Sequence, residues 1–346
     1  MNITVTKWNV NNIVQLEDAQ RILMRNRVQE VDVDWDDDPL KYEFVSVDNR
    51  DIDDTRSIQI DSMRYRYSIF KGKVERPVSK KKWYDENENL VDREERIKVI
   101  ESTFLLYETQ QGLALISIGA ATTVRKVVNY MFKESEWGSI TVSNFNIQED
   151  LYYWLLYRLK DEENHDLSVD GNLKITGLLS YLGKTDDGSN AIRGNGRRVL
   201  SILGTLAYIF SSDSLKALRP EVQYNGKLFV IELTMNNSFK VYEDYCTGLN
   251  NLTDQEKIIT LSIYTIEKVI PTILSSYRHS IRLNRWSTQI KSDFLKSIGE
   301  ELIETINDRM GLLENEEVEE VSIENTLGDG LVMELEEDLL EGDLVT

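Results

Sequence analysis

STFLLYE at residues 102–108 and LALISI at residues 113–118 are apolar runs joined by a short segment that ends in Gly112. Two such runs, connected by a few residues that include glycine, are typical of a β-hairpin. Gly119 closes the second run, and Thr122 or Thr123 can cap a helix that extends to about Phe132. A hairpin followed directly by a helix indicates a chain that mixes antiparallel strands with helices.

The regions on both sides of this hairpin continue the mixture. Alternation of apolar and polar residues predicts further strands at residues 3–5, 41–47, 57–70, 140–142, 173–175, 223–233 and 239–242. Helical periodicity predicts helices at residues 92–100, 146–160, 197–210 and 253–310. We expect Pro271 to kink or split the last helix and Gly311 to end it.

These elements predict an α+β fold with a strand-rich N-terminal region, a mixed α/β middle, long C-terminal helices and a disordered acidic tail. The polar, turn-rich stretch 161–171 favours a boundary between an N-terminal α+β domain, residues 1–160, and a mixed region, residues 171–313, that ends in a helical segment. Residues 314–346 form the expected tail.

Composition and cysteine content favour a cytoplasmic protein. The sequence starts without a basic segment followed by an apolar run, so we expect no signal peptide, and its apolar runs are short for a membrane span. The single cysteine, Cys246, excludes an intramolecular disulfide, and it is most often a small buried residue in such a context.

The net charge of −20 is distributed unevenly along the chain. Residues 314–346 hold 13 Asp or Glu and no Lys or Arg, whereas residues 30–54 hold 11 acids against Lys41 and Arg50. Residues 171–299 are the opposite, with 16 Lys or Arg against 11 Asp or Glu. This distribution allows a polyanion partner in the middle region, and it allows the acidic tail to capture a protein or only to confer solubility.

Sequence motifs for catalysis and metal binding are incomplete. His165 and His279 lack metal-ligand spacing, and the P-loop-like segment 177–185 has five residues between its glycines where four are required. Residues 32–39 resemble a calcium loop but lack its glycine and its final glutamate. We therefore predict no catalytic residues, no metal and no cofactor, and whether the protein is an enzyme stays open, with a non-enzyme favoured.

One incomplete motif leaves a nuclease reading open. Glu221 and Glu232 resemble the acids of metal-dependent nucleases of the PD-(D/E)xK type, but Thr234 occupies the position of the lysine. An ordinary edge-strand glutamate is the better interpretation of Glu232.

Arg193, Gly194, Gly196, Arg197 and Arg198 form the first candidate binding segment, directly before an apolar helix. Two glycines allow positive φ, a helix N-terminus carries partial positive charge, and guanidinium groups match phosphate geometry. These features predict an anion site, and a surface loop with exposed arginines is the simpler alternative.

A second basic cluster comprises Arg278, Arg282 and Arg285, at the spacing i, i+4 and i+7 of one helix face. Tyr277 and Trp286 flank it, and Lys291 and Lys296 extend it. Cationic side chains beside aromatic rings favour contacts with nucleic-acid phosphates. The alternative is that these arginines pair with the acidic N-terminal stretch or with the tail.

The segment from FLLYE at residues 104–108 through GLAL at 112–115 and GAATT at 119–123 to Phe132 resembles a hairpin-to-helix segment in phage-exclusion proteins of the Rex type. Defence proteins of the Kiwa type share a similar general organisation. The resemblance covers residues 104–132 and implies an accessory DNA-binding component that senses infection, with no individual residue carried over.

We therefore expect a non-enzymatic nucleic-acid-binding or sensing component of a phage-defence or mobile-element system. The first alternative is an acidic protein-interaction module or DNA-mimicking antagonist, and the second is a degenerate metal-dependent nuclease. A helical stripe that includes Trp286, Ile290, Phe294, Ile298, Leu302 and Ile306 also predicts either an intramolecular core or a homo-oligomer through the C-terminal helices.

Overall fold

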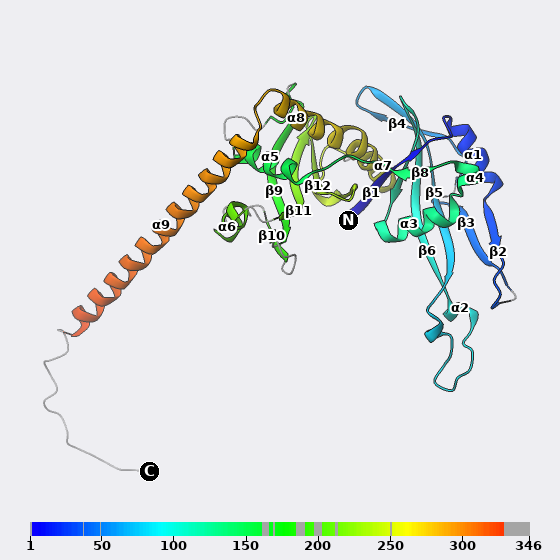
Figure 1. Cartoon of the computed structure of the whole chain (residues 1–346), viewed down its shortest axis with the longest axis horizontal. Helices are drawn as coiled ribbons and strands as arrows, with labels where there is room; N and C mark the ends of the chain where they lie inside the picture. The colour runs from blue at the N-terminus through cyan, green and yellow to red at the C-terminus, as the bar shows by residue number, and fades with distance from the viewer. Residues whose placement is uncertain are drawn as a thin grey trace, which may run out of the picture.

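The computed structural model describes residues 2–36, 38–48, 50–160, 166–168, 170–184, 191–196, 203–211, 214–249 and 251–328, the last 17 of these by their backbone only. Figure 1 shows a body of strands and helices from which one long helix projects. The architecture is α+β, as the sequence predicts.

One antiparallel sheet of 13 strands runs through the body in the order β10-β9-β11-β12-β13-β1-β7-β6-β5-β3-β2, with β4 paired to β5 and β8 paired to β1. The strands are β1 (Asn2–Val10), β2 (Val28–Val31), β3 (Leu40–Ser46), β4 (Arg56–Ile60), β5 (Met63–Pro77), β6 (Ile97–Thr109), β7 (Gly112–Ile118), β8 (Ile140–Val142), β9 (Leu173–Lys184), β10 (Ala191–Asn195), β11 (Ser214–Tyr224), β12 (Lys227–Thr234) and β13 (Ser238–Tyr242). The predicted hairpin at residues 102–118 is β6–β7, with Thr109 opposite Gly112.

The main helices are α1 (Leu16–Arg25), α2 (Arg93–Arg96), α3 (Ala121–Met131), α4 (Glu134–Trp137), α5 (Glu149–Lys160), α6 (Leu203–Ser211), α7 (Asp254–Tyr264), α8 (Ile270–Arg282) and α9 (Thr288–Gly328).

Two hydrophobic cores lie on the two faces of the sheet. The smaller core packs α1, α3 and α4 against strands of the N-terminal half, with Leu16, Phe104 and Val127 among its members. The larger core joins residues from both predicted domains, such as Leu105 and Phe229, so the sheet and this core include described residues from both sides of the predicted boundary.

Two segments predicted as single strands are hairpins. Residues 57–70 turn at Asp61, which has φ of +52°, and residues 223–233 turn at Asn225-Gly226, with φ of +47° and +75°. Two consecutive positive φ values produce the two-residue turn that matches strand twist, and Asn-Gly is its strongest sequence signal. A further correction is that residues 97–100 begin β6 rather than continuing a helix. The strand predicted at residues 173–175 is longer, because β9 runs to Lys184 and includes the P-loop-like segment 177–183.

Pro271 does not split the C-terminal helix. A π-helical turn, η4 (Thr265–Val269), connects α7 directly to α8, and Pro271 lies in the first turn of α8. A proline ring clashes with the carbonyl four residues earlier, here that of Glu267, and the wider π-turn accommodates it. The chain instead breaks after Arg282, where Asn284 has φ of +54°.

Gly311 does not end the last helix, contrary to prediction. α9 is continuous from Thr288 to Gly328, because an interior glycine costs only about 1 kcal/mol of helix stability relative to alanine. Residues 314–328, which the sequence assigned to the disordered tail, therefore continue α9, and residues 329–346 lie outside the described residues.

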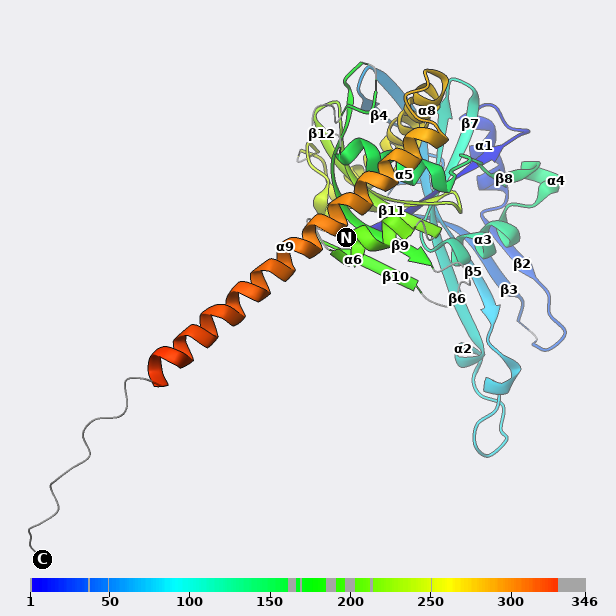
Figure 2. The same cartoon turned by 60° about the vertical axis from the view of Figure 1, so that its left-hand side comes forward.

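α9 is half embedded and half projecting. Phe294 and Ile298 are buried in the larger core, whereas Ile303, Ile306 and Met310 are exposed. Figures 1 and 2 show the outer part of the helix leading away from the body in both views. The predicted apolar stripe thus serves the intramolecular core in its first half, and its second half has no partner among the described residues.

One helical stretch, Asp254–Arg282, is long and apolar enough to cross a membrane by length and composition, and 67% of its most apolar window is buried inside the protein. Because η4 joins α7 and α8, this stretch is longer than the apolar runs on which the sequence-based expectation rested. Core helices of soluble proteins have the same property, so the stretch does not by itself indicate a membrane protein.

Candidate nucleic-acid interface

Arg193 and Gly194 lie in the edge strand β10, and not in a loop before a helix. Arg193 is exposed and pairs across the sheet with Leu182. Gly196 has the expected positive φ, +123°, but its N–H donates to the carbonyl of Leu179 at 2.9 Å. The predicted cradle of outward N–H groups is therefore wrong at Gly194 and Gly196, because sheet pairing and this bond use the backbone. Arg197 and Arg198 lie outside the described residues.

The sheet brings Arg193 to the same face as cationic residues that sequence reasoning missed. Residues opposite each other on antiparallel strands share a face. Arg193 lies opposite Leu182, and Ser180, two residues earlier, lies opposite Arg219. Lys240 in β13 lies opposite Glu232 in β12, and Glu232 pairs with Arg219 at 2.7 Å. We call Arg193, Asn195, Arg219, Glu232, Lys240 and Tyr242 the polar sheet face.

Tyr242 is central to this face. The Arg219 guanidinium lies 3.9 Å from the centre of its ring, and the Lys240 ammonium lies 5.4 Å from it. Its hydroxyl donates to Glu232 at 2.8 Å, and burial together with this carboxylate raises the pKa of Tyr242 to about 12. Burial opposes ionisation of Glu232, but hydrogen bonds from Arg219 and Tyr242 outweigh it and lower the pKa of Glu232.

The charges on the polar sheet face do not cancel. Glu232 forms an ion pair with Arg219 and also interacts electrostatically with Lys240, so one carboxylate faces two cations, and Arg193 has no carboxylate at ion-pair distance among the described residues. A cavity of about 270 Å³ adjoins them, lined by Leu179, Asn195, Gly196, Arg219, Val230, Tyr242 and Tyr245. Tyr245 is 49% exposed, so its ring is accessible beside the cationic groups. The Asn225-Gly226 turn signal could have revealed this site, because that turn places Arg219 opposite Glu232.

The second predicted cluster is partly dispersed by the helix end. Arg278 and Arg282 lie on exposed positions of α8 at i and i+4, but α8 ends at Arg282, so Arg285 lies in the following turn. The prediction of one shared helix face therefore holds for two of the three arginines. None of the three is paired with a carboxylate in the described part of the chain.

Three of the four residues expected to flank or extend this cluster are held within the fold. Trp286 is buried, and both its indole N–H and the Tyr277 hydroxyl donate to Asp150 Oδ2, at 2.6 and 2.7 Å. Lys291 pairs with Asp150 Oδ1 at 3.4 Å, and Lys296 approaches Glu300 at 3.9 Å. The two aromatic rings and Lys291 therefore join α5 to α8 and α9 rather than forming a stacking surface, whereas Lys296 stays exposed on α9.

The two basic regions lie on opposite faces of the sheet. α8 packs on the face that carries the larger core, together with α5, whereas the polar sheet face is the other face of β9–β13. Figure 1 shows α8 above this part of the sheet, in which β10 is the edge strand. The polar sheet face and the arginines of α8 therefore do not form one continuous binding surface in the described structure.

The acidic N-terminal stretch pairs with other arginines. Asp36 contacts Arg93 at 3.0 Å and Arg96 at 3.1 Å, and Asp48 makes a two-pronged contact with Arg56 at 2.7 and 2.8 Å. The alternative that this stretch neutralises Arg278, Arg282 and Arg285 is therefore wrong for the described residues.

The nuclease reading has little geometric basis. Glu232 is held by Arg219 and Tyr242, and Glu221 accepts a hydrogen bond from Thr176 at 2.9 Å. β12 has a neighbour on both sides, so Glu232 does not lie on an edge strand, contrary to the sequence interpretation. Within the described residues, no group of three or more His, Cys, Asp or Glu is placed to hold a metal ion.

Neither a protein-family model nor a curated protein matches this sequence. The resemblance to Rex-type and Kiwa-type proteins therefore stays a prediction.

Proposed function

We propose that this protein is a non-enzymatic nucleic-acid-binding or sensing component that acts in the cytoplasm, in a phage-defence or mobile-element system. The observation that carries the proposal is the polar sheet face, where Arg193 and Lys240, neither of them in an ion pair with a described carboxylate, flank the stacked pair of Arg219 and Tyr242. Cations attract phosphates, and accessible aromatic rings such as Tyr245 stack on unpaired bases. This combination favours single-stranded nucleic acid.

The test is binding of labelled single-stranded and double-stranded DNA and RNA across a salt series. Each phosphate contact with a single strand contributes about 0.7 to the slope of log affinity against log salt. Arg193→Ala with Lys240→Ala should therefore lower the slope by about 1.4 and weaken binding at low salt. Arg21→Ala is the control, because Arg21 is equally cationic and exposed but belongs to α1 and pairs with Asp18.

The second basic group is tested separately. If Arg278, Arg282 and Arg285 also contact phosphates, their triple substitution by alanine lowers the slope by a further 2.1 or so. Failure of the unmodified protein to bind any of these nucleic acids at low salt would remove the proposal. Binding that neither set of substitutions changes would show that both surfaces were wrongly chosen.

The acidic C-terminal segment adds a prediction about regulation. A chain that ends at Leu313 lacks 13 carboxylates, some on the projecting end of α9 and the rest beyond it; if α9 bends and lets this segment fold back, it could compete with nucleic acid as a polyanion mimic. We expect this truncation to tighten nucleic-acid binding at low salt. Unchanged affinity would exclude autoinhibition without affecting the assignment of the polar sheet face.

A second candidate function is an acidic protein-interaction module, which could mimic DNA towards a basic partner. The outer part of α9 favours it, because exposed Ile303, Ile306 and Met310 alternate with exposed Glu304 and Asp308 on a projecting helix. Capture of a specific basic partner by the full chain, and its loss when Ile303 and Met310 are replaced by serine, would support this function over the first. Sedimentation of the unmodified protein and of this serine variant, each alone, would detect a homo-oligomer.

A further inference from the structure

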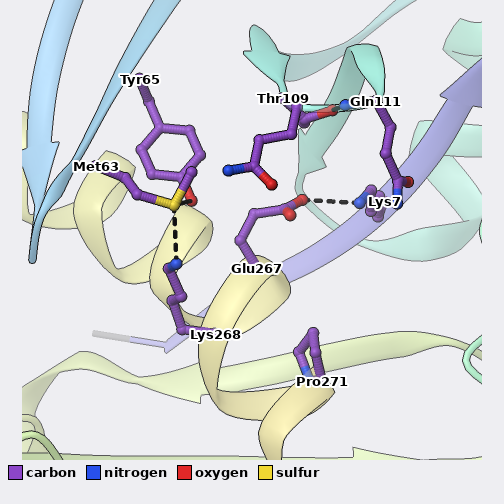
Figure 3. Close-up of a pocket in the computed structure, with 9 residues that line it drawn as sticks. Lys7, Met63, Tyr65, Thr109, Gln111, Glu267, Lys268 and Pro271 are labelled. Carbon is purple, nitrogen blue, oxygen red and sulfur yellow. Dashed lines mark hydrogen bonds and ion pairs between the residues drawn. The ribbon is translucent and has the colours of Figure 1, made fainter.

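A second cavity, of about 330 Å³, lies on the opposite face of the sheet from the polar sheet face. Its walls come from β1, β5, the β6–β7 turn and the π-turn η4, through the side chains of Lys7, Met63, Tyr65, Thr109, Gln110, Gln111, Glu267, Lys268 and Pro271. Figure 3 shows Lys7 reaching Glu267 and Lys268 reaching Met63 across it. Cavities of this size suit small-molecule ligands.

The carboxylate in this cavity, Glu267, already has a hydrogen-bond donor and an ion-pair partner within the protein. Glu267 Oε1 accepts a hydrogen bond from the buried Tyr107 hydroxyl and pairs with Lys7 at 2.7 Å. The two members of the ion pair are only 20% and 17% exposed, so the pair is well shielded from water. Glu267 is therefore a poor site for a further cation, since its charge is neutralised and its oxygen carries two donors.

Lys268, the next residue, is different. It is half-buried, and its ammonium has one described contact, the Met63 sulfur at 3.1 Å. A thioether is a weak acceptor, and Lys268 has no carboxylate partner among the described residues. The Lys7–Glu267 pair is neutral, so the cavity retains one uncompensated positive charge. Partly burying an ammonium without an anion is unfavourable, and a bound anion would relieve that cost.

The other residues that line the cavity indicate what the rest of the ligand should be like. Gln110 and Gln111 are exposed at the hairpin turn and offer amide donors and acceptors, while Tyr65 and Pro271 offer flat apolar surface. We propose that this cavity binds a small polar organic anion, with its phosphate or carboxylate group on the Lys268 ammonium. The proposal is independent of nucleic-acid binding, because none of its residues belongs to the polar sheet face.

The π-turn that accommodates Pro271 carries both Glu267 and Lys268. π-turns within helices are frequent at functional sites.

The experiment measures thermal unfolding and calorimetric binding with matched pairs of probes. Ribose 5-phosphate is compared with ribose, and glucuronate with glucose, so that the two members of each pair differ mainly in the anionic group. The unmodified protein should bind at least one anion and neither neutral sugar, and the pair that responds distinguishes phosphate from carboxylate. Lys268→Met, which keeps most of the length of the side chain and removes its charge, should weaken binding roughly ten- to hundredfold, the usual effect of losing a hydrogen bond to a charged group.

Lys296→Met is the matched control, because Lys296 is an exposed lysine on α9 outside the cavity. It should bind as the unmodified protein does. The proposal is overturned if neither anion binds, if the neutral sugars bind equally well, or if Lys268→Met binds unchanged while retaining the unfolding temperature of the unmodified protein.

Discussion

At the scale of the residue, Cys246 illustrates a side chain whose environment was correctly predicted. It is buried, and its thiol donates to the carbonyl oxygen of Tyr242 at 3.3 Å. Burial, the largest influence on this group, raises the pKa of the thiol to about 11. A thiol in the unfolded chain ionises near pH 8.5 or so.

This difference predicts an alkaline loss of stability. The folded pKa is the higher one, so the contribution of Cys246 is fully present below about pH 8.5 and is lost as the pH rises towards 11. Between pH 8 and pH 10 the unmodified protein should lose about 1–2 kcal/mol more unfolding free energy than Cys246→Ala, as measured by urea unfolding. The shared tyrosines titrate in both proteins and cancel. Parallel losses would show that the thiol is accessible to water.

Two glycines provide a second prediction at this scale. Gly226 in the β11–β12 turn has φ of +75°, whereas Gly204 lies in helix α6, and an added Cβ meets nothing within 4 Å at either position. Steric contact is therefore matched and only the backbone conformation differs. Gly226→Ala should destabilise by about 1–2 kcal/mol, because L-residues disfavour positive φ. Gly204→Ala should stabilise by about 0.5–1 kcal/mol. Equal changes in urea unfolding would contradict the assigned turn.

At the scale of the element, the apolar stripe of α9 is buried in its first part and exposed in its second. Ile298 is fully buried against the body, whereas Ile303 is 61% exposed. Periodicity assigns both to an apolar stripe and cannot distinguish them, because the distinction depends on where the body of the protein ends.

Matched truncations of these two side chains test that division. Ile298→Ala should cost about 2–5 kcal/mol of unfolding free energy, since it leaves a cavity in the larger core. Ile303→Ala should cost less than about 0.5 kcal/mol, as exposed substitutions usually do. Chemical unfolding of the two variants measures this. A comparable loss at Ile303 would mean that the outer part of α9 is covered in solution, as a homo-oligomer would require.

At the scale of the whole molecule, one sheet and one large core connect the N-terminal and middle regions. β1 lies between β13 and β7, so the first strand of the chain joins its two halves. α9 then closes the larger core with Trp286, Phe294 and Ile298 from its beginning and the turn before it.

Two C-terminal truncations follow from this arrangement. A chain that ends at Leu302 keeps Phe294 and Ile298 and should melt within a few degrees of the full protein. A chain that ends at Ser287 loses both, and at about 2–5 kcal/mol for each large buried side chain it should melt far lower or not fold. Thermal unfolding followed by circular dichroism distinguishes these outcomes. A stable chain ending at Ser287 would show that α9 contributes little to the core.

Local chemistry determined much of the fold. The β6–β7 hairpin, α3, α5 and β13 follow from apolar alternation, turn glycines and helix-end charges within a few residues. The helix predicted at residues 97–100 was wrong. These residues begin β6, which pairs with β5 over 11 residues, and such pairing with another strand overrides a weak local helix propensity.

For the candidate site, too, sequence determined one part and only the tertiary structure determined the rest. Sequence alone identified the exposed cations Arg193, Arg278 and Arg282, because clustered arginines are visible along the chain. Only the tertiary structure decided that Arg193 shares a face with Arg219 and Lys240, that Tyr277 and Trp286 are held inward by Asp150, and that Lys268 faces a cavity. Strand register and helix ends set these relations, and both depend on contacts between segments far apart in sequence.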